Sequence, residues 1–530
     1  MKLFIISLIP LLILFIIKLK RAFHMIQQNR YNDGYRYIKW INKNIKKNFI
    51  TIELLFILLF ILSLIISNKI IIYMHTFIYI IISYIIYKII KKEQVKKKLV
   101  FTKRIQRLLI TTLILFIIPS FIIFKNFNIN NVGYYYLILD LMVYLIHYIE
   151  ILANFINKPI EKLVYLYYFN KARTKLKNMS NLDVIGITGS YGKTSSKNII
   201  YDILNVKYNV FQTPLNYNTP YGLCNTVNNY LDKFSNFFVA EMGALKVGEI
   251  KSCCDVVKPK YGIITKIGKA HLESFGSIDN ILKTKFELIE SLPSDGIGIL
   301  NGDDKLQLKY KIKNKCKILY IGIDNHDVDL YATNIKLTNK GTTFDCKFKN
   351  DKKLYTFQTG LLGYNNIYNL LTGILLGHEL GIDIDKLIYA VKMVKPVEHR
   401  LELKQNNGLY IIDDAYNSNP IGSKMALEVL GMMDGVKIVV TPGMIELGSE
   451  QYKENYEFGK VMAKHTDYAI LVGEVQTKPI YEGLIKEKFN KDNIYVINDV
   501  KKAFPIINKL KKDDTYVLLE NDLPDVFNEE

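Results

Sequence analysis

The segment VIGITGSYGKTSSKNII (184–200) combines a short apolar strand with a glycine-rich loop that opens a helix. Residues 184–188 are typical of a buried strand, and residues 189–200 of a loop that leads into a helix. Such a turn exposes backbone N–H groups at the positive end of the helix dipole, where phosphate groups bind. Lys193 adds a mobile cation for the β- and γ-phosphates, and Thr194 offers a hydroxyl to Mg²⁺. The segment therefore predicts a nucleotide-phosphate site.

This loop is shorter than the G-x-x-x-x-G-K-[ST] pattern, because Ile187 stands where the first glycine belongs. What remains is Gly189-x-x-Gly192-Lys193-Thr194, and a chance Gly-Lys-Thr turn is the alternative to a phosphate loop. We expect the nucleotide to contact every residue of the run, namely Gly189, Ser190, Tyr191, Gly192, Lys193, Thr194 and Ser195.

Outward from the loop, short β-rich runs alternate with helical runs, which is typical of a parallel α/β fold. Residues 237–243 and 261–268 predict further strands of the same domain. Four later runs (436–443, 467–474, 493–499 and 515–522) predict a Rossmann-like last domain. We therefore expect a transmembrane region at 1–157, a linker helix at 158–180, a central ATP-binding domain at 181–395 and a C-terminal Rossmann-like domain at 396–530.

The first part of the chain is apolar and helical in pattern. Five apolar runs predict about five membrane-spanning helices: 3–17, 54–66, 70–90, 108–124 and 134–155. The first run is short, but basic residues follow it directly and no small-residue cleavage site appears, so we expect an uncleaved anchor rather than a signal peptide. An interfacial helix is the alternative for this run.

Charge predicts the orientation of these spans. Residues 1–180 hold 27 Lys and Arg against 6 Asp and Glu, whereas residues 181–530 hold 43 and 44. Loop 18–49 carries nine basic residues and loop 91–107 carries eight, while the alternate loops carry one each. The positive-inside rule places both basic loops, and with five spans everything after residue 155, in the cytoplasm. Because the basic excess is topological, nucleic acid is not expected as a partner.

Two further features bound the chemistry. The five cysteines form no C-x-x-C pair, which indicates neither a disulfide framework nor a zinc ribbon and fits a reducing cytosol. Asp140, His147, Glu150 and Asn154 share one face of the fifth predicted span. Ionisable groups in a bilayer suggest a function such as contact with a lipid head group, and a polar seam between helices is the plainer explanation that we favour.

Nine motifs in order along residues 181–530 resemble the Mur ligase family, and most closely its D-alanyl-D-alanine-adding member. Besides TGSYGKTS (188–195) they are QTPLNYNTPYGL (212–223), EMGALKVGEI (241–250), AHLESFGSIDNILKTKFELI (270–289), NGDD (301–304), GYNNIYNLLTGI (363–374), EHRLE (398–402), IIDDAYNSNP (411–420) and TPGMIELG (441–448). The resemblance implies a bacterial ligase of peptidoglycan precursor synthesis that forms an amide bond with ATP and Mg²⁺, through an acyl phosphate.

The resemblance also implies metal ligands. Thr194 and Glu241 would hold the first Mg²⁺, and His271 and Lys285 the second, with Lys285 carbamylated as in many family members. The alternatives are a helix-capping carboxylate for Glu241, an ordinary loop histidine for His271 and an exposed helix lysine for Lys285. The catalytic set implied by the family is Lys193, His271, Lys285 and Arg400.

Nucleotide and substrate contacts follow in the same way. Asn301, Asn366 and Asn369 resemble ATP-binding asparagines, although Asn366 or Asn369 could simply cap or pair within its helix, and Arg400 would reach the γ-phosphate. Either Asp413 or Asp414 would face the ribose, and the sequence does not choose between them. The expected acceptor contacts are Asn216 and Asn218, and the expected amine contacts are Tyr416, Asn417 and Asn419. The implied partners are a muramyl-peptide precursor, D-alanyl-D-alanine, membrane lipid and other cell-wall synthesis proteins.

The chain departs from the family in three places. Soluble D-alanyl-D-alanine-adding enzymes begin with a domain that holds the uridine nucleotide, and here membrane spans stand in its place. Thr219 and Lys266 replace residues that are more often Asn. A membrane enzyme acting on lipid-linked precursor, of the amidotransferase type, is therefore an alternative, as are a non-catalytic scaffold and a folate or poly-amino-acid ligase.

Overall fold

The computed structural model describes residues 2–29, 31, 35–91, 98–268, 270, 272–338, 340–406, 408–416, 418–445 and 447–522. These residues divide into two compact units, Met1–Leu166 and Tyr167–Glu530. The division falls inside one long helix, α9 (Ile146–Lys177). We call the first the membrane unit and the second the ligase unit, and describe each by itself.

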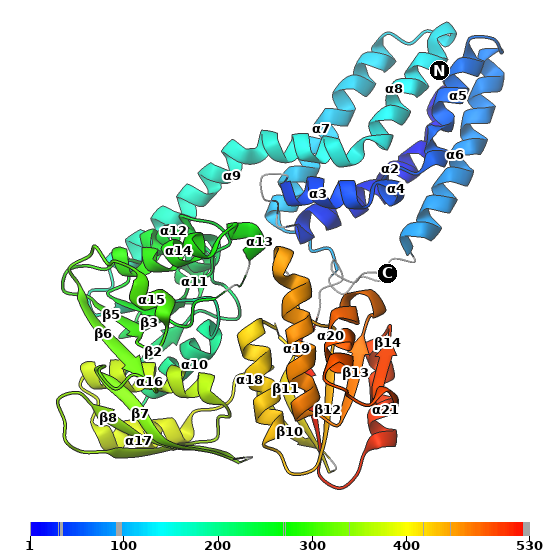
Figure 1. Ribbon diagram of the computed structural model, residues 1–530. Coiled ribbons are helices and arrows are strands. Elements are labelled where there is room, and N and C mark those ends of the chain that lie inside the picture. The colour runs from blue at the N-terminus through cyan, green and yellow to red at the C-terminus, as the bar shows by residue number, and fades with distance from the viewer. Residues whose placement is uncertain are drawn as a thin grey trace. The chain divides into compact units, whose positions relative to one another are not determined.

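In its described residues the membrane unit consists of helices and the turns between them, as the blue and cyan ribbons of Figure 1 show. Its elements are α1 (Lys2–Ser7), α2 (Ile9–Gln28), α3 (Tyr35–Lys43), α4 (Ile45–Asn48), η1 (Thr51–Leu54), α5 (Leu55–Ser63), α6 (Asn68–Lys91), α7 (Lys103–Lys125), η2 (Ile129–Asn131), α8 (Val132–Tyr144) and the first turns of α9.

Three of its segments, Lys2–Gln28, Asn68–Lys91 and Lys103–Lys125, are long and apolar enough to cross a membrane. The pair α8–α9 passes the same test only as a helix bent by 71°, which raises the count to four. The second predicted span is a shorter apolar helix, Thr51–Ser63. The predicted count of five is therefore not confirmed, because two of the five runs form a short helix and a broken one.

The predicted end of the first span, at residue 17, lies before the end of the helix in the structure. We expected residues 18–49 to form a basic loop, but α2 continues to Gln28 and buries two of its cations. Lys18 is only 4 % exposed and its Nζ lies 2.5 Å from Glu53 Oε2. The Arg21 guanidinium donates to Asn48 Oδ1 at 2.8 Å and lies over the Trp40 ring. Burial of these two groups is possible because each has a polar partner.

The ligase unit begins with a central domain built on a nine-stranded sheet, shown in green and yellow-green in Figure 1. The strand order is β2 (Val210–Gln212), β3 (Phe237–Glu241), β1 (Asp183–Thr188), β4 (Tyr261–Ile264), β5 (Ile297–Asn301), β6 (Lys317–Gly322), β7 (Leu330–Thr338), β8 (Gly341–Phe348) and β9 (Tyr355–Thr359). Strands β2 to β7 pair in parallel and β7 to β9 in antiparallel fashion.

Helices surround this sheet because its central strands are apolar along their whole length, as in β1, where residues 184–188 are all buried. The helices are α10 (Lys193–Leu204), α11 (Pro220–Asn229), α12 (Glu249–Val257), α13 (Leu272–Phe275), α14 (Ile278–Glu290), α15 (Lys305–Lys309), α16 (Tyr364–Glu379) and α17 (Ile384–Met393). One core cluster joins α10 and α16 to the strands, through residues such as Ile199, Ile203 and Leu370. The phosphate loop therefore stands on a well-packed base.

The last domain is a six-stranded sheet in the order β10 (Glu402–Asn406), β11 (Leu409–Asp414), β15 (Thr515–Glu520), β12 (Val436–Thr441), β13 (Tyr468–Val472) and β14 (Ile494–Ile497). All neighbours pair in parallel except β10 with β11. Its helices are η3 (Gly448–Glu450), α18 (Pro420–Gly431), α19 (Gln451–His465), α20 (Glu474–Lys486), η4 (Lys491–Asn493), η5 (Val500–Lys502) and α21 (Ala503–Leu510). The α/β architecture expected from the sequence is thus observed in both domains.

Candidate active site

The phosphate loop connects the buried strand β1 to helix α10 through two glycines in left-handed backbone conformations. Gly189 has φ +154° and Gly192, which precedes the first residue of the helix, has φ +80°. A Cβ at Gly189 would lie 1.9 Å from Thr265 Oγ1, so no larger residue fits there without displacing the neighbouring strand end. The loop conformation therefore depends on glycine at this position.

A second backbone segment holds the loop from the other side. The Ser190 N–H donates to the Lys266 carbonyl at 2.8 Å, and the Gly268 N–H donates to Ser190 Oγ at 3.0 Å. Tyr191 and Lys266 form an isolated β-bridge, and Thr265 donates its hydroxyl to the Tyr191 carbonyl. Because residue 266 acts here through its backbone, lysine in place of the family's more usual asparagine leaves this support intact.

Lys193, Thr194 and Ser195 open helix α10 and are half-buried. The Lys193 ammonium donates to the carbonyls of Gly189 (2.8 Å) and Ser190 (3.2 Å), which places the cation at the mouth of the loop. Burial lowers the pKa of Lys193, and the nearby Arg400 lowers it further, whereas Glu241 raises it. Lys193 therefore lies within electrostatic reach of residues from both domains.

Glu241 ends strand β3, whose residue 241 is in register with residue 187 of β1. The side chain is 3 % exposed, and its Oε1 accepts a hydrogen bond from Asn218 Nδ2 at 3.1 Å. Its Oε2 lies 3.5 Å from Lys197 Nζ and has no hydrogen-bond partner among the described residues. A buried carboxylate oxygen of this kind suits a hard cation, so it fits a Mg²⁺ ligand.

Lys285 lies on the inner face of α14 and is 3 % exposed, whereas Lys283 on the same helix is exposed. The interpretation of Lys285 as an exposed helix lysine is therefore wrong. Burial lowers its pKa to about 7, and the nearby Lys193 contributes in the same direction. An amine with this pKa is substantially neutral at physiological pH, so it can react with CO₂.

His271 lies outside the described residues, and the structure says nothing of its side chain. Within the described part of the chain, no group of three or more His, Cys, Asp or Glu side chains is arranged to hold a metal ion. Of the predicted ligands Glu241, Thr194 and carbamylated Lys285, only Glu241 belongs to these four residue types, so the absence of such a group does not bear on them. The donor chemistry of the site therefore remains compatible with Mg²⁺.

The three predicted ATP-binding asparagines separate into two places. Asn369 on α16 is 6 % exposed and lies against the phosphate loop, where its Oδ1 accepts from Ser196 Oγ at 2.7 Å and would meet a Cβ at Gly192 at 3.2 Å. Asn366 is one turn away and donates to the Leu362 carbonyl at 2.9 Å. Asn301 ends β5, where its side chain accepts the Asp303 N–H at 2.9 Å. Of the three, Asn369 is the one whose side chain contacts the phosphate-loop region in the described part of the chain.

Arg400 lies between two residues with left-handed backbone angles, His399 (φ 60°) and Leu401 (φ 50°). Its guanidinium lies 4.3 Å from the centre of the Tyr416 ring. The same cation acts electrostatically on Lys193 of the phosphate loop and on Asp414. Non-glycine residues in this conformation cost free energy, and such strain is common where a side chain must be aimed at a site. The geometry is consistent with Arg400 facing the phosphate loop.

The two aspartates that end β11 have different surroundings. Asp413 Oδ2 accepts hydrogen bonds from Lys404 at 2.7 Å and from His399 at 2.8 Å. Burial alone would raise the pKa of Asp413, but these two bonds more than offset it and the pKa is lowered. Burial raises the pKa of Asp414 to about 6, against the opposing effect of Arg400. Asp413 is thus engaged within its own domain, and Asp414 is the more available of the two.

The predicted substrate residues are partly placed. Asn216 is exposed, and Asn218 is tied to Glu241 as described above. Asn419 caps helix α18 by accepting the Gly422 N–H at 2.8 Å, and Tyr416 is half exposed beside Arg400. Asn417 lies outside the described residues. The loop that carries the predicted acceptor residues Asn216 and Asn218 is therefore hydrogen-bonded to the predicted metal ligand Glu241.

Two functional candidates escaped the sequence analysis. Lys197 is 3 % exposed and lies 3.5 Å from Glu241 Oε2, and it donates to the carbonyls of Thr213 and Leu215. Its spacing of four residues from Lys193 on one helix could have revealed it. Glu520 ends β15 beside Asp414, is fully buried and accepts from Ser418 Oγ at 2.6 Å. No sequence motif marks that residue.

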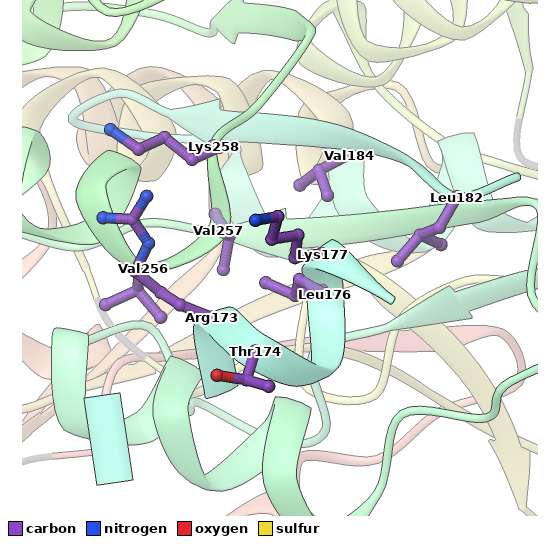
Figure 2. Close-up of a pocket in the computed structure, with 9 residues that line it drawn as sticks. All are labelled: Arg173, Thr174, Leu176, Lys177, Leu182, Val184, Val256, Val257 and Lys258. Carbon is purple, nitrogen blue, oxygen red and sulfur yellow. The ribbon is translucent and has the colours of Figure 1, made fainter. Parts of the chain in front are cut away.

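A separate hollow of about 390 Å³ lies at the opposite end of β1 from the phosphate loop. Figure 2 shows the side chains that line it, where the apolar Val184, Val256 and Val257 lie among the basic Arg173, Lys177 and Lys258. These three cations are exposed to solvent. Because it faces the amino end of the strand, this hollow is distinct from the candidate active site.

Comparison with known families agrees with this geometry. The Mur ligase middle domain matches residues 187–377, and the Mur ligase glutamate ligase domain matches residues 399–519. The first match contains the phosphate loop, Glu241 and Lys285, and the second contains Arg400 and Asp414.

Individual proteins give the same result. The UDP-N-acetylmuramoyl-tripeptide–D-alanyl-D-alanine ligase of Bacillus subtilis is 33 % identical over 316 residues, 59 % of this chain and 66 % of that protein. The ligase of the same name from Escherichia coli is 30 % identical over 55 % of this chain and 64 % of that protein. The chain thus spans less than two thirds of the length of these curated relatives.

Among solved structures, MurF ligase from Thermotoga maritima in complex with ADP superposes with a TM-score of 0.61 at 26 % identity. That likeness covers 68 % of this chain and 80 % of the other. MurF from Acinetobacter baumannii, at 23 % identity and a TM-score of 0.60, shares the fold over 68 % of this chain and 77 % of its own. The chain belongs to the Mur ligase family.

Proposed function

We propose that this chain is an ATP-dependent amide-bond-forming ligase that adds D-alanyl-D-alanine to a muramyl tripeptide. The observation that carries the proposal is that the Lys193 ammonium of the phosphate loop interacts electrostatically with two buried groups, the Glu241 carboxylate and the Lys285 amine. The substrates are those in the names of the Bacillus subtilis and Escherichia coli relatives. The domain limits at residues 181–395 and 396–530 belong to the same proposal.

In the first step, the acceptor carboxylate attacks the γ-phosphorus of ATP, so that an acyl phosphate forms and ADP leaves. Lys193 and the loop N–H groups from Gly189 to Ser195 stabilise the phosphate charge that develops. Arg400 adds a second cation from the other domain, since it already acts electrostatically on Lys193. Asn301, Asn366 and Asn369 are assigned to the nucleotide, and Asp414, rather than the engaged Asp413, to its ribose.

The residues present fit Mg²⁺. Glu241 and the Thr194 hydroxyl would hold one ion beside the phosphates, and His271 with Lys285 a second. The ions, when bound, neutralise phosphate charge. Lys285 itself supplies a ligand only if its neutral amine captures CO₂ as a carbamate, for which burial and the lowered pKa of about 7 prepare it.

In the second step, the amine attacks the acyl carbon and phosphate leaves, which forms the amide bond. We assign Tyr416, Asn417 and Asn419 to the amine side and Asn216 and Asn218 to the acceptor side. The hydrogen bond from Asn218 to Glu241 supports this, because it connects the acceptor loop to the metal-binding carboxylate.

We further propose that the ligase unit lies on the cytoplasmic face of the bacterial cytoplasmic membrane. Segments 18–49 and 91–107 are rich in Lys and Arg, and five crossings would place both on one side with the ligase unit. This count takes the short helix Thr51–Ser63 as one crossing and the bent pair α8–α9 as another. A membrane location supports lipid, and other cell-wall synthesis proteins, as partners and a lipid-linked acceptor as the alternative to a UDP-linked one.

The experiment is to incubate the detergent-solubilised chain with ATP, Mg²⁺ and either a UDP-linked or a lipid-linked muramyl tripeptide, with D-alanyl-D-alanine. We expect a product heavier by the dipeptide less one water, together with one ADP per amide bond. ATP binding without turnover on either acceptor would favour a non-catalytic scaffold and contradict the proposal.

A further inference from the structure

Helices α8 and α9 of the membrane unit bury a continuous row of polar side chains. Each position of the row is at most 8 % exposed and follows the previous one by three or four residues, except across the break between the helices. The row comprises Tyr136, Asp140, His147, Glu150, Asn154, Asn157 and Glu161. Residues at this spacing share one helix face, with about 5 to 6 Å between neighbouring Cβ atoms, a gap that one water molecule can bridge.

The row is contacted by a different helix at almost every step. His75 of α6 lies 3.1 Å from Asp140, and Tyr37 of α3 hydrogen-bonds His147 at 2.7 Å. Thr112 of α7 donates to Glu150 at 2.8 Å. A polar seam that holds helices together requires only these contacts, so a further observation must decide whether the row does more.

That observation is a set of buried polar atoms without hydrogen-bond partners in the described part of the chain. Three lie on the row itself, at every second position: Asp140 Oδ2, Glu150 Oε2 and Asn157 Nδ2. Two more, His75 Nδ1 and Glu53 Oε1, lie on other elements of the unit. A polar atom without a partner in an apolar interior costs free energy unless water or an ion meets it. Repetition of the feature at alternate positions indicates water along the row rather than one isolated defect.

The break between α8 and α9 does not interrupt the row. The helices meet at an angle of 71°, and Lys18 Nζ lies 3.5 Å from the Tyr144 carbonyl that ends α8. The same ammonium lies 2.5 Å from Glu53 Oε2. Broken helices at membrane depth occur where the freed backbone groups line a polar or water-filled region. The Lys18–Glu53 ion pair therefore lies beside the break between the two halves of the row.

Glu150 is a carboxylate in the part of the row that lies on α9. The groups that face it or its immediate partners are Thr112 of α7, His147 on its own helix, Tyr37 of α3 and, through Tyr37, Arg21 of α2. All are buried or nearly so. Glu150 thus sits among a hydroxyl, an imidazole and a phenol, each of which can donate and accept a proton.

The row comes near a hollow at Asn154. Asn154 donates to the Tyr31 carbonyl at 3.2 Å, and Gln27 donates to the Tyr31 hydroxyl at 3.2 Å. Gln27 also lines a hollow of about 520 Å³ together with His24, Gln28, Lys98 and Val100. Tyr31 therefore lies between the row and this hollow.

We propose that the membrane unit conducts protons along α8 and α9, through Glu150, His147 and the His75–Asp140 pair, an inference that rests on the proposed membrane location but not on the ligase reaction. Protons enter from water on one face and leave to water on the other, so only O–H and N–H bonds are exchanged. The charge carried is balanced by a counter-ion across the membrane.

The test uses full-length protein in lipid vesicles loaded with a pH-sensitive dye, with an imposed pH difference and valinomycin with potassium to balance charge. We expect proton entry at least about tenfold faster than in empty vesicles. Glu150→Gln should lower it to the empty-vesicle rate, because glutamine keeps the bond from Thr112 but cannot carry a proton. Thr76→Val is the matched control, since Thr76 bonds only its own helix at Ile72 and should conduct as the unmodified chain does.

Asp140→Asn provides a second variant on the other half of the row, in case Glu150→Gln does not fold. Protein that inserts into vesicles, as shown by protease protection, and conducts no faster than empty vesicles would overturn the proton path alone and leave a structural seam. Conduction that survives both substitutions would overturn it equally. Failure to insert would overturn the membrane location with it.

Discussion

In the membrane unit, buried cations meet buried carboxylates or amides, as Lys18 meets Glu53 and Arg21 meets Asn48. In the ligase unit, the buried charges around the phosphate loop are less closely paired, because Glu241 Oε2 lies 3.5 Å from Lys197 Nζ and Lys285 is buried near a second cation, Lys193. A closely paired charge stabilises the fold, whereas a loosely paired buried charge beside a phosphate loop can interact with a ligand. The comparison predicts opposite consequences for mutations in the two units.

The largest effect should follow from breaking the Lys18–Glu53 pair. Lys18→Met leaves a carboxylate that is 3 % exposed without its cation, so we expect a loss of about 3 to 5 kcal/mol of stability. Thermal unfolding in detergent measures it. The double variant Lys18→Met with Glu53→Gln should recover most of the loss, and equal destabilisation by both variants would contradict the pairing.

Next in size is Lys193→Ala on the phosphate loop. In the proposed mechanism the residue stabilises transferred phosphoryl charge rather than a core, so we expect ligation to fall about 10²-fold or more with the unfolding midpoint unchanged. Lys283→Ala, at an exposed lysine of α14, is the control and should ligate normally. Normal turnover by a folded Lys193→Ala variant would refute the assignment.

A smaller and pH-dependent effect is expected at Lys285. Only the neutral amine captures CO₂. Because the pKa of Lys285 is lowered to about 7, the fraction of neutral amine increases as pH rises through 7 and decreases as pH falls below it. Activity should therefore decline on the acid side and recover partly with added bicarbonate. If Lys285→Ala matched the unmodified chain with and without bicarbonate, the lysine would have no metal-binding role.

The smallest effect should come from removing the membrane unit. A chain that starts near Lys158 should retain ATP binding but use a lipid-linked acceptor less efficiently, because the membrane no longer concentrates enzyme and acceptor together. The two forms are compared by ligation rate on lipid-linked and soluble acceptors. Equal rates on every acceptor would show the membrane unit to be a tether only.

The features that could be predicted from the sequence are those that depend on neighbouring residues. The strand, loop and helix around GSYGKT were predicted because glycine conformation and apolar runs act over a few positions, and the family resemblance is confirmed by both domain matches. The apolar helices were also predicted in place. Their number was not, since a run such as 54–66 or 134–155 does not show whether it continues, shortens or breaks.

Other features depend on packing between distant segments. The sequence could not choose between Asp413 and Asp414, and our proposal of Asp414 for the ribose rests on Lys404 and His399, which engage Asp413. Lys197 was missed for a similar reason, because its role depends on the end of β3 lying alongside α10.

The sequence by itself determined the α/β architecture of the ligase unit, the phosphate loop and the apolar nature of the first unit, because these follow from local periodicity and glycine placement. Only the tertiary structure decided that Lys285 is buried while Lys283 is exposed, that Lys18 and Arg21 lie inside a helix bundle, and that α8 and α9 break at Leu145. The physical reason is that burial and pairing are set by which distant side chain arrives beside a group, and local pattern does not encode that arrival.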